Sequence, residues 1–210
     1  MPSTESEFIV KKILAVVAVA TTLLLTGCSQ VGSAASVGST KISQATVQGS
    51  IDAILAARKG VDTSQMQLQT GEELNRGQLR FHLLTALLRD VATEIKLSVS
   101  KAEIDTRRQS ILDQVGGADQ LPNALVGAGI APNDFDQYIE AISLSDKISE
   151  ALKAAGIADA DIGAQIQKLV VAKAKELGVT VNPRYGKWDG TVADVVATDS
   201  AGTAVTPSTK

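Results

Sequence analysis

The chain has 210 residues, of which 44% are hydrophobic and 3% aromatic, and its formal net charge is −3. This length predicts one domain with flexible ends, and the mild acidity argues against a nucleic-acid partner, which requires a basic surface. Cys28 is the single cysteine, so the fold cannot depend on an intramolecular disulfide.

The first 27 residues have the three parts of an export signal. Lys11 and Lys12 precede an apolar run over residues 13–25 that is shorter than the roughly 20 residues a stable membrane span needs, and small residues follow it. The four residues that end at Cys28, Leu-Thr-Gly-Cys, resemble the lipobox of bacterial lipoproteins. That resemblance implies diacylglycerol on the Cys28 sulfur and cleavage just before it. The alternative is an ordinary secretory signal or a single-pass anchor with an incidental cysteine.

The resemblance also implies a place in the cell: the protein is expected on the extracytoplasmic side of the cell membrane, held by its lipid. Residues 1–27 are then a lipoprotein signal peptide. Residues 28–35 are small and polar, which predicts a tether. Residues 191–210 lack periodicity and are predicted to be a disordered tail.

Helical periodicity dominates the segment between the tether and the tail. Ser43 and Ser100 are positioned as N-caps, and Glu103 completes a capping box with Ser100. Gly116 and Gly178 follow apolar periodic segments, where left-handed C-caps are common. The predicted helices cover residues 43–58, 72–97, 101–116, 119–126, 133–154 and 159–177.

Two segments depart from the helical pattern and are predicted strands. Residues 36–42 and 179–181 lie at opposite ends of the helical region. A lone strand leaves backbone groups unpaired, so the two are expected to pair with each other. The predicted fold is therefore mainly α, with about five to six helices closed by a small two-stranded pairing of the domain's N- and C-terminal segments.

A longer motif then suggests a family. The element order, together with Val-Asn-Pro-Arg-Tyr-Gly-Lys-Trp-Asp over residues 181–189, resembles the N-terminal domain of SurA-like periplasmic chaperones. The resemblance extends to residues 37–43, 99–104 and 125–130, covers about residues 36–190, and is closest to the lipoprotein branch of high-GC Gram-positive bacteria. It implies a helical module that holds unfolded or partly folded envelope proteins.

Many members of that family also carry a parvulin-type prolyl isomerase domain with histidines in its active site. His82 is the only histidine here, so isomerase activity is not carried over. A metal site needs several converging donors, and we therefore predict a structural or surface role for His82.

The family motif could contact a bound peptide or stabilise the fold. We favour a structural role, in which Tyr185 and Trp188 fasten the closing strand onto the helices. Pro183 would fix the path of this segment, and Gly186 would permit a tight turn. The motif residues are Asn182, Pro183, Arg184, Tyr185, Gly186, Trp188 and Asp189.

The remaining charged residues have simple interpretations. Carboxylates near helix starts complement the helix dipole, and arginines on helices are expected to be solvated. The carboxylates are Asp134, Asp136, Glu140, Asp159 and Asp161, and the arginines are Arg76, Arg80, Arg107 and Arg108. We predict no catalytic residue, metal, cofactor or small-molecule substrate, and hence no enzyme.

These observations support one leading function and two alternatives. The leading hypothesis is a membrane-anchored, ATP-independent chaperone or holdase for unfolded or partly folded exported proteins. The second is a structural or adaptor lipoprotein that binds one specific envelope partner, and the third is a peptidyl-prolyl isomerase. A solute-binding lipoprotein fits least well, because such proteins usually have two α/β lobes.

Overall fold

A computed structural model describes residues 32–198, so the predicted signal peptide and Cys28 lie outside the described residues. This region is mainly helical, as predicted. Its α-helices are α2 (Gln44–Arg58), α3 (Gly71–Glu94), α4 (Lys101–Val115), α5 (Leu121–Ala128), α6 (Phe135–Ala154) and α7 (Asp159–Leu177).

Polar caps fix the starts of two helices. The Ser43 hydroxyl accepts a hydrogen bond from the Thr46 amide at 2.9 Å at the start of α2. Ser100 and Glu103 form the predicted capping box at α4, in which each side chain satisfies a backbone N–H that the first turn leaves free. At the end of α4, Gly116 adopts the left-handed conformation, with φ of 91°.

Three helix boundaries differ from the prediction. Helix α3 ends at Glu94 instead of residue 97, because Lys96 takes a positive φ of 60° and the chain turns. Short 3₁₀ turns, η1 (Ala118–Gln120) and η2 (Pro132–Asp134), open the segments predicted as the starts of α5 and α6. Gly178 has a positive φ of 74° but a ψ of 127°, so it is not the predicted left-handed cap.

The ends of the domain do pair, as the sequence predicted. Strand β1 (Ser33–Val37) is the centre of an antiparallel sheet, with β2 (Thr40–Ser43) on one side and β3 (Val179–Val181) on the other. Val37 stands opposite Val179. The prediction of a single strand over residues 36–42 was wrong, because the chain reverses at Gly38 and forms a β1–β2 hairpin.

The predicted tether also ended too late. Residues 33–35 belong to β1, and both Ala34 and Ala35 are buried in the main core. Small side chains are typical of linkers, but here they allow the strand to approach the helices closely. Composition alone could not separate these two cases.

A second hairpin corrects the predicted tail. After η3 (Pro183–Tyr185), β4 (Lys187–Asp189) pairs with β5 (Asp194–Val196). Ala193 and Val195 are buried, so this part of the 191–210 segment is folded. A three-residue strand is too short to show periodicity, and only its tertiary contacts reveal it.

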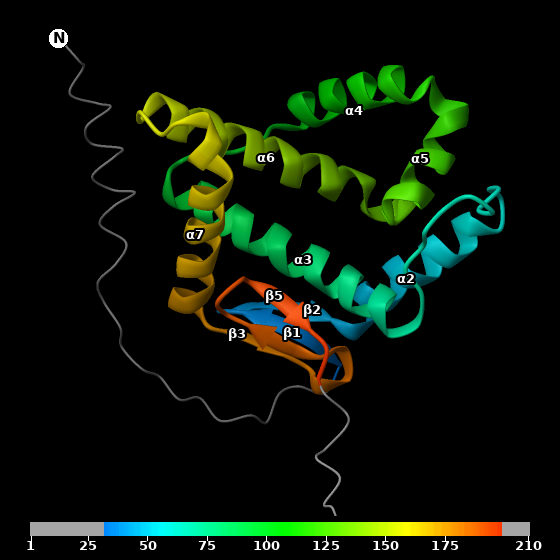
Figure 1. Cartoon of the computed structure of the whole chain (residues 1–210), viewed down its shortest axis with the longest axis horizontal. Helices are drawn as coiled ribbons and strands as arrows, with labels where there is room; N and C mark the ends of the chain where they lie inside the picture. The colour runs from blue at the N-terminus through cyan, green and yellow to red at the C-terminus, as the bar shows by residue number, and fades with distance from the viewer. Residues whose placement is uncertain (1–31, 199–210) are drawn as a thin grey trace, which may run out of the picture.

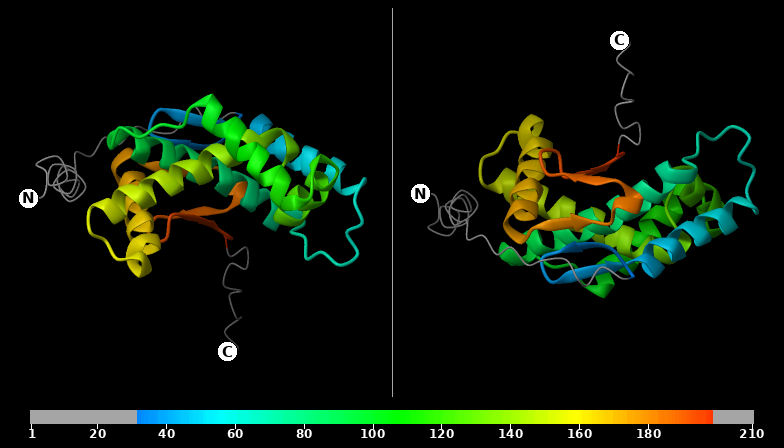
Figure 2. Two further views of the ribbon diagram at one scale, coloured as in Figure 1. Left: turned by 90° about the horizontal axis from the view of Figure 1, so that it is seen from above. Right: turned by 90° about the horizontal axis from the view of Figure 1, so that it is seen from below.

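The elements stack in layers around α3 (Figure 1). The strands lie on one side of α3 and α6 lies on the other, with α4 beyond α6. Figure 2 looks along this stacking direction, with α4 and α6 towards the viewer from above and the strands towards the viewer from below. One apolar cluster joins β1, β2, α2, α3 and α7, and a second joins α3, α6 and α7. Among the helices within residues 32–198, none combines the length and apolar character needed to cross a membrane.

Candidate functional site

A third, smaller apolar cluster lies apart from the two main ones, between α4, α5 and α6. Its buried members are Leu125, Phe135 and Ile139. Ile104 and Ile111 of α4 pack against it, but none of the 15 residues of α4 is itself buried. Helix α4 therefore covers apolar surface of α5 and α6 without being embedded in the core.

A cavity of about 290 Å³ opens between these three helices. Most of the residues that line it are hydrophobic, whereas Arg107 and Gln114 are polar and Tyr138 carries a hydroxyl. We call it the α4–α6 groove. It is lined by Arg107, Ile111, Gln114, Leu121, Ala124, Leu125, Ala128, Ile130, Phe135, Tyr138 and Ile142.

Ion pairs hold α4 to α6 beside this groove. The Arg107 guanidinium lies 3.1 Å from the Asp146 carboxylate, and Arg108 pairs with Asp136. The Arg108 guanidinium also lies 5.6 Å from the centroid of the Phe135 ring, within the range of a cation–π contact. These arginines and Asp136 thus link two helices, a role that the prediction of solvated arginines and a dipole carboxylate missed.

A further ion pair fastens the start of α4. Lys147 Nζ lies 2.5 Å from Glu103 and donates to the Ser98 carbonyl at 2.7 Å. The hydrogen bond from Lys147, followed by those from Ser100, lowers the pKa of Glu103 to about 2. Glu103 is therefore ionised at any physiological pH, and this pair persists throughout that range.

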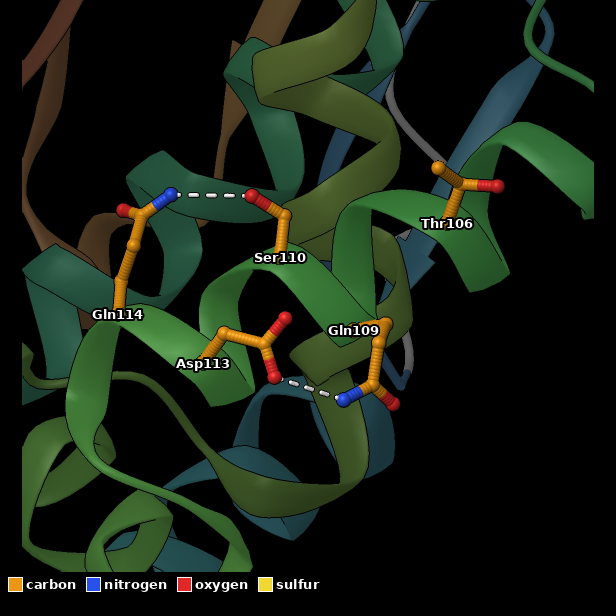
Figure 3. Close-up of a pocket in the computed structure, with 5 residues that line it drawn as sticks. All are labelled: Thr106, Gln109, Ser110, Asp113 and Gln114. Atoms are coloured by element: carbon orange, nitrogen blue, oxygen red, sulfur yellow. Dashed lines mark hydrogen bonds between the residues drawn. The ribbon is translucent and has the colours of Figure 1, made fainter.

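The outer face of α4 is polar (Figure 3). Its shallow hollow is lined by Thr106, Gln109, Ser110, Asp113 and Gln114. Gln109 donates to Asp113 at 2.9 Å, and Gln114 donates to Ser110 at 3.0 Å. These bonds join residues four apart on one helix, so this face is an ordinary solvated surface and the apolar side of α4 faces the groove.

His82 lies in a buried polar cluster that connects α2, α3 and η2. The Ser50 hydroxyl donates to the Asp134 carboxylate at 2.5 Å and lies 2.9 Å from His82 Nε2. Because that hydroxyl proton is used, His82 Nε2–H must donate to Ser50, and the Gln137 amide then donates to Nδ1 at 3.4 Å. Asp134 therefore serves this buried cluster, and its predicted role at a helix start was incomplete.

The same three residue types occur in hydrolase triads, but this geometry differs. A triad needs the carboxylate on the second histidine nitrogen and a serine that substrate can reach. Here Ser50 is completely buried, and the Asp134 oxygen lies 3.8 Å from the same nitrogen that Ser50 occupies. Burial is the main cause that lowers the pKa of His82, and Asp134 partly opposes it. The cluster thus has a structural role.

Other predicted surface charges also connect elements. Arg80 lies 3.2 Å from Asp194 and so joins α3 to β5. Glu140 accepts two hydrogen bonds from Arg89, at 2.8 and 2.5 Å, across α3 and α6. Asp159 and Asp161 do occupy the first turn of α7, and Arg76 pairs with Glu72 on its own helix.

The family motif lies on the strand side of the molecule, away from the α4–α6 groove. The Asn182 amide N–H donates to the Ala34 carbonyl at 2.9 Å, and its side chain donates to Ser33 at 3.1 Å. The Asn182 side-chain oxygen accepts from the Arg184 amide at 3.1 Å. Asn182 therefore ties the C-terminal segment to β1.

The rest of the motif packs or closes turns. Tyr185 is buried and Trp188 is half-buried against the main core, while Pro183 is exposed. A Cβ on Gly186 would lie 2.2 Å from the Val196 carbonyl oxygen, so close approach of β5 requires glycine there. Asp189 accepts hydrogen bonds from Thr191 in the β4–β5 turn.

Comparison with known proteins supports the family. The model of the SurA-like N-terminal domain matches residues 2–149, which is well over half of the chain. The chain belongs to this family. The match includes α2 to α5 and most of α6, with the whole α4–α6 groove, whereas α7, β3–β5 and the motif around Trp188 lie beyond it. No curated protein and no solved structure matches the chain.

The groove residues were not identified from the sequence. Their helical spacing was interpreted as ordinary core, and the aromatic motif near the C-terminus was the one segment weighed as a possible peptide contact. The available signal was the weak apolar face of α4, where charged residues separate Ile104 from Ile111.

Proposed function

We propose that this protein is a membrane-anchored extracytoplasmic lipoprotein and an ATP-independent holdase for unfolded or partly folded exported proteins. The SurA-like domain associates it with a family that binds unfolded proteins. The observation that carries the proposal is the apolar α4–α6 groove, which is covered by a helix with no buried residue.

The groove explains how client binding would occur. At about 290 Å³ the closed cavity holds only a few side chains, and a client segment needs a larger surface. In the closed domain, Ile104 and Ile111 of α4 cover the apolar residues Leu125, Phe135 and Ile139. Displacement of α4 would expose these three residues. Apolar side chains of the client would then replace those of α4.

An aggregation assay tests this proposal. The purified domain without its signal peptide should delay aggregation of a denatured test protein at near-stoichiometric ratio. Ile142→Gln should weaken that effect, because Ile142 lines the groove from α6, which stays in place when α4 is displaced. Leu55→Gln makes the same chemical change at an exposed position of α2 and should leave the effect intact. If wild-type protein gives no delay at any ratio, the holdase proposal fails.

One observation favours an adaptor lipoprotein as a second candidate. Within the described part of the chain, the exposed large hydrophobic residues are Leu55, at 44%, and Val192, at 47%. A closed domain with so little apolar surface would suit one specific partner. Photo-crosslinking in cells from Gln114, at the groove, separates the two: a holdase captures many clients and an adaptor captures one.

The anchor and the absence of catalysis have their own tests. Cys28→Ser should release the protein from the membrane fraction while its fold stays intact, because the proposed role of Cys28 is attachment only. A diacylglyceryl group supplies two chains, which is enough for stable anchoring. A proline-limited refolding assay should show no acceleration, and acceleration would instead support a prolyl isomerase.

A further inference from the structure

The position of β1 limits how far the domain can lie from its proposed anchor. Strand β1 starts at Ser33, five residues after Cys28. An extended chain spans at most about 3.3–3.6 Å per residue, so Ser33 lies within roughly 18 Å of Cys28. This argument rests on the lipid anchor proposed above.

Hydrogen bonds define the surface around that strand start. The Ser33 carbonyl accepts from Asn182 at 3.1 Å and from the Gln44 side chain at 3.4 Å. The Arg184 guanidinium in turn donates to the Gln44 side chain at 3.5 Å. We call the surface formed by Ser33, the first turn of α2 and η3 the anchor face.

Positive charge is available on and beside the anchor face. Arg184 is exposed on η3, and Lys187 is exposed at the start of the following strand. Neither residue forms an ion pair with another residue in the 32–198 region. Asp189, two residues after Lys187, has a pKa lowered first by hydrogen bonds from Thr191 and to a lesser degree by the charge of Lys187, so it offsets part of the positive charge of this segment. The N-terminus of α2 adds partial positive charge.

The anchor face and the α4–α6 groove lie on opposite sides of α3 (Figure 1). Strand β1 packs against one side of α3, and α6 packs against the other, with α4 outside α6 (Figure 1). If the domain meets the membrane through the anchor face, the groove is therefore directed away from the lipid.

We infer that the anchor face rests on the anionic lipid headgroups of the membrane that holds Cys28, with Arg184 and Lys187 contacting their phosphates. A short tether supplies proximity, and the two cations supply attraction, each about fivefold in binding near an anionic surface. The domain thereby acquires a fixed orientation, and clients reach the groove from the side facing away from the membrane.

Fluorescence quenching on vesicles tests this orientation with the lipidated full-length protein. Because lipid occupies Cys28, a new cysteine is the only free thiol. One dye is placed by Ala45→Cys in the first turn of α2, and another by Gln109→Cys on the outer face of α4. A headgroup-attached quencher in phosphatidylcholine vesicles containing phosphatidylglycerol should quench the dye at position 45 several-fold more strongly. Equal quenching, or stronger quenching at position 109, overturns the inference.

A charge comparison tests the role of the two cations. Arg184→Gln with Lys187→Gln should remove the extra quenching at position 45 that phosphatidylglycerol produces over phosphatidylcholine alone. Lys101→Gln with Lys153→Gln makes the same charge change on α4 and α6 and should retain it. If both double variants behave alike, the headgroup contact is refuted.

Mass spectrometry of Cys28 keeps this outcome separate from the proposed function. If Cys28 is unmodified and the protein does not sediment with vesicles, the anchor itself is refuted. A lipidated protein with equal quenching at the two dye positions would refute only the orientation.

Discussion

The ion pairs between α4 and α6 lead to the most informative prediction. Replacing both Arg107 and Arg108 with Gln removes their pairs with Asp146 and Asp136, and also the contact of Arg108 with the Phe135 ring. Arginine and glutamine have similar helix propensities, so α4 itself should keep its helical structure. The change should therefore act on the docking of α4 rather than on its formation.

The size of the effect follows from the exposure of these groups. Each pair is partly solvent-exposed, and such pairs contribute about 0.2–1 kcal/mol. The cation–π contact adds roughly 0.5–1 kcal/mol. The double variant should thus lower the free energy for opening α4 by about 1–3 kcal/mol, which raises the open population roughly 5–150-fold.

Hydrogen exchange and aggregation assays measure this change. In the wild type, α4 amides should exchange through an opening of lower free energy than α3 amides, because α3 carries ten buried residues and α4 carries none. In the double variant, α4 exchange should accelerate by the factor above, and aggregation should be delayed at a lower protein ratio. Lys101→Gln is the control, since within residues 32–198 the one ion-pair partner of Lys101 is Asp105 of the same helix.

Two results would refute this reasoning. Equal opening free energies for α3 and α4 in the wild type would show that α4 does not open separately. A double variant that protects the test protein no better than Lys101→Gln would show that opening of α4 does not expose the client site.

Three predictions concern stability. Burial is the main cause that lowers the pKa of His82 from its ordinary 6.5, so below about pH 6.5 the unfolded chain binds more protons than the folded one and the free energy of unfolding falls. Urea midpoints measured against pH should show this fall, and His82→Gln should reduce it below about pH 6.5. An unchanged curve for the variant would contradict the assignment to His82. Trp188→Ala should lower the melting temperature, with a loss of roughly 1–3 kcal/mol from its half-buried contact with the core; an unchanged melt would instead indicate a purely surface role. Gly186→Ala should destabilise the protein by roughly 1–3 kcal/mol, since its φ is 126° and its Cβ would meet the Val196 carbonyl; Gly190→Ala in the same hairpin, where the nearest atom is 3.6 Å away, should be nearly neutral, and equal melting of the two variants would contradict this.

Local signals in the sequence predicted much of the fold. Ser43, Ser100 and Gly116 mark helix boundaries because a cap depends on the backbone groups of the adjacent turn, which sequence spacing fixes. The pairing of the two end segments was also predictable, since two lone strands at the ends of a helical domain have few other partners, but the register that sets Val37 opposite Val179 was not. The exact strand limits were not, because Ala34 and Val195 become strand residues only through contacts with distant segments.

The candidate site could not be predicted from local sequence patterns. The groove depends on α4, α5 and α6 meeting at one place, and no residue of α4 is buried enough to give a strong apolar pattern. Likewise, Ser50, His82 and Asp134 are far apart in the sequence, and each alone looks unremarkable in its helix or turn.

The sequence by itself determined the helical class of the domain, the caps of its helices and the pairing of its ends. Each of these follows from short-range hydrogen bonding and from the period of apolar side chains. The tertiary structure decided which apolar surface is covered by a weakly buried helix, which charges join two helices, and which face lies beside the start of β1. Those properties depend on distances between segments that the chain brings together only on folding.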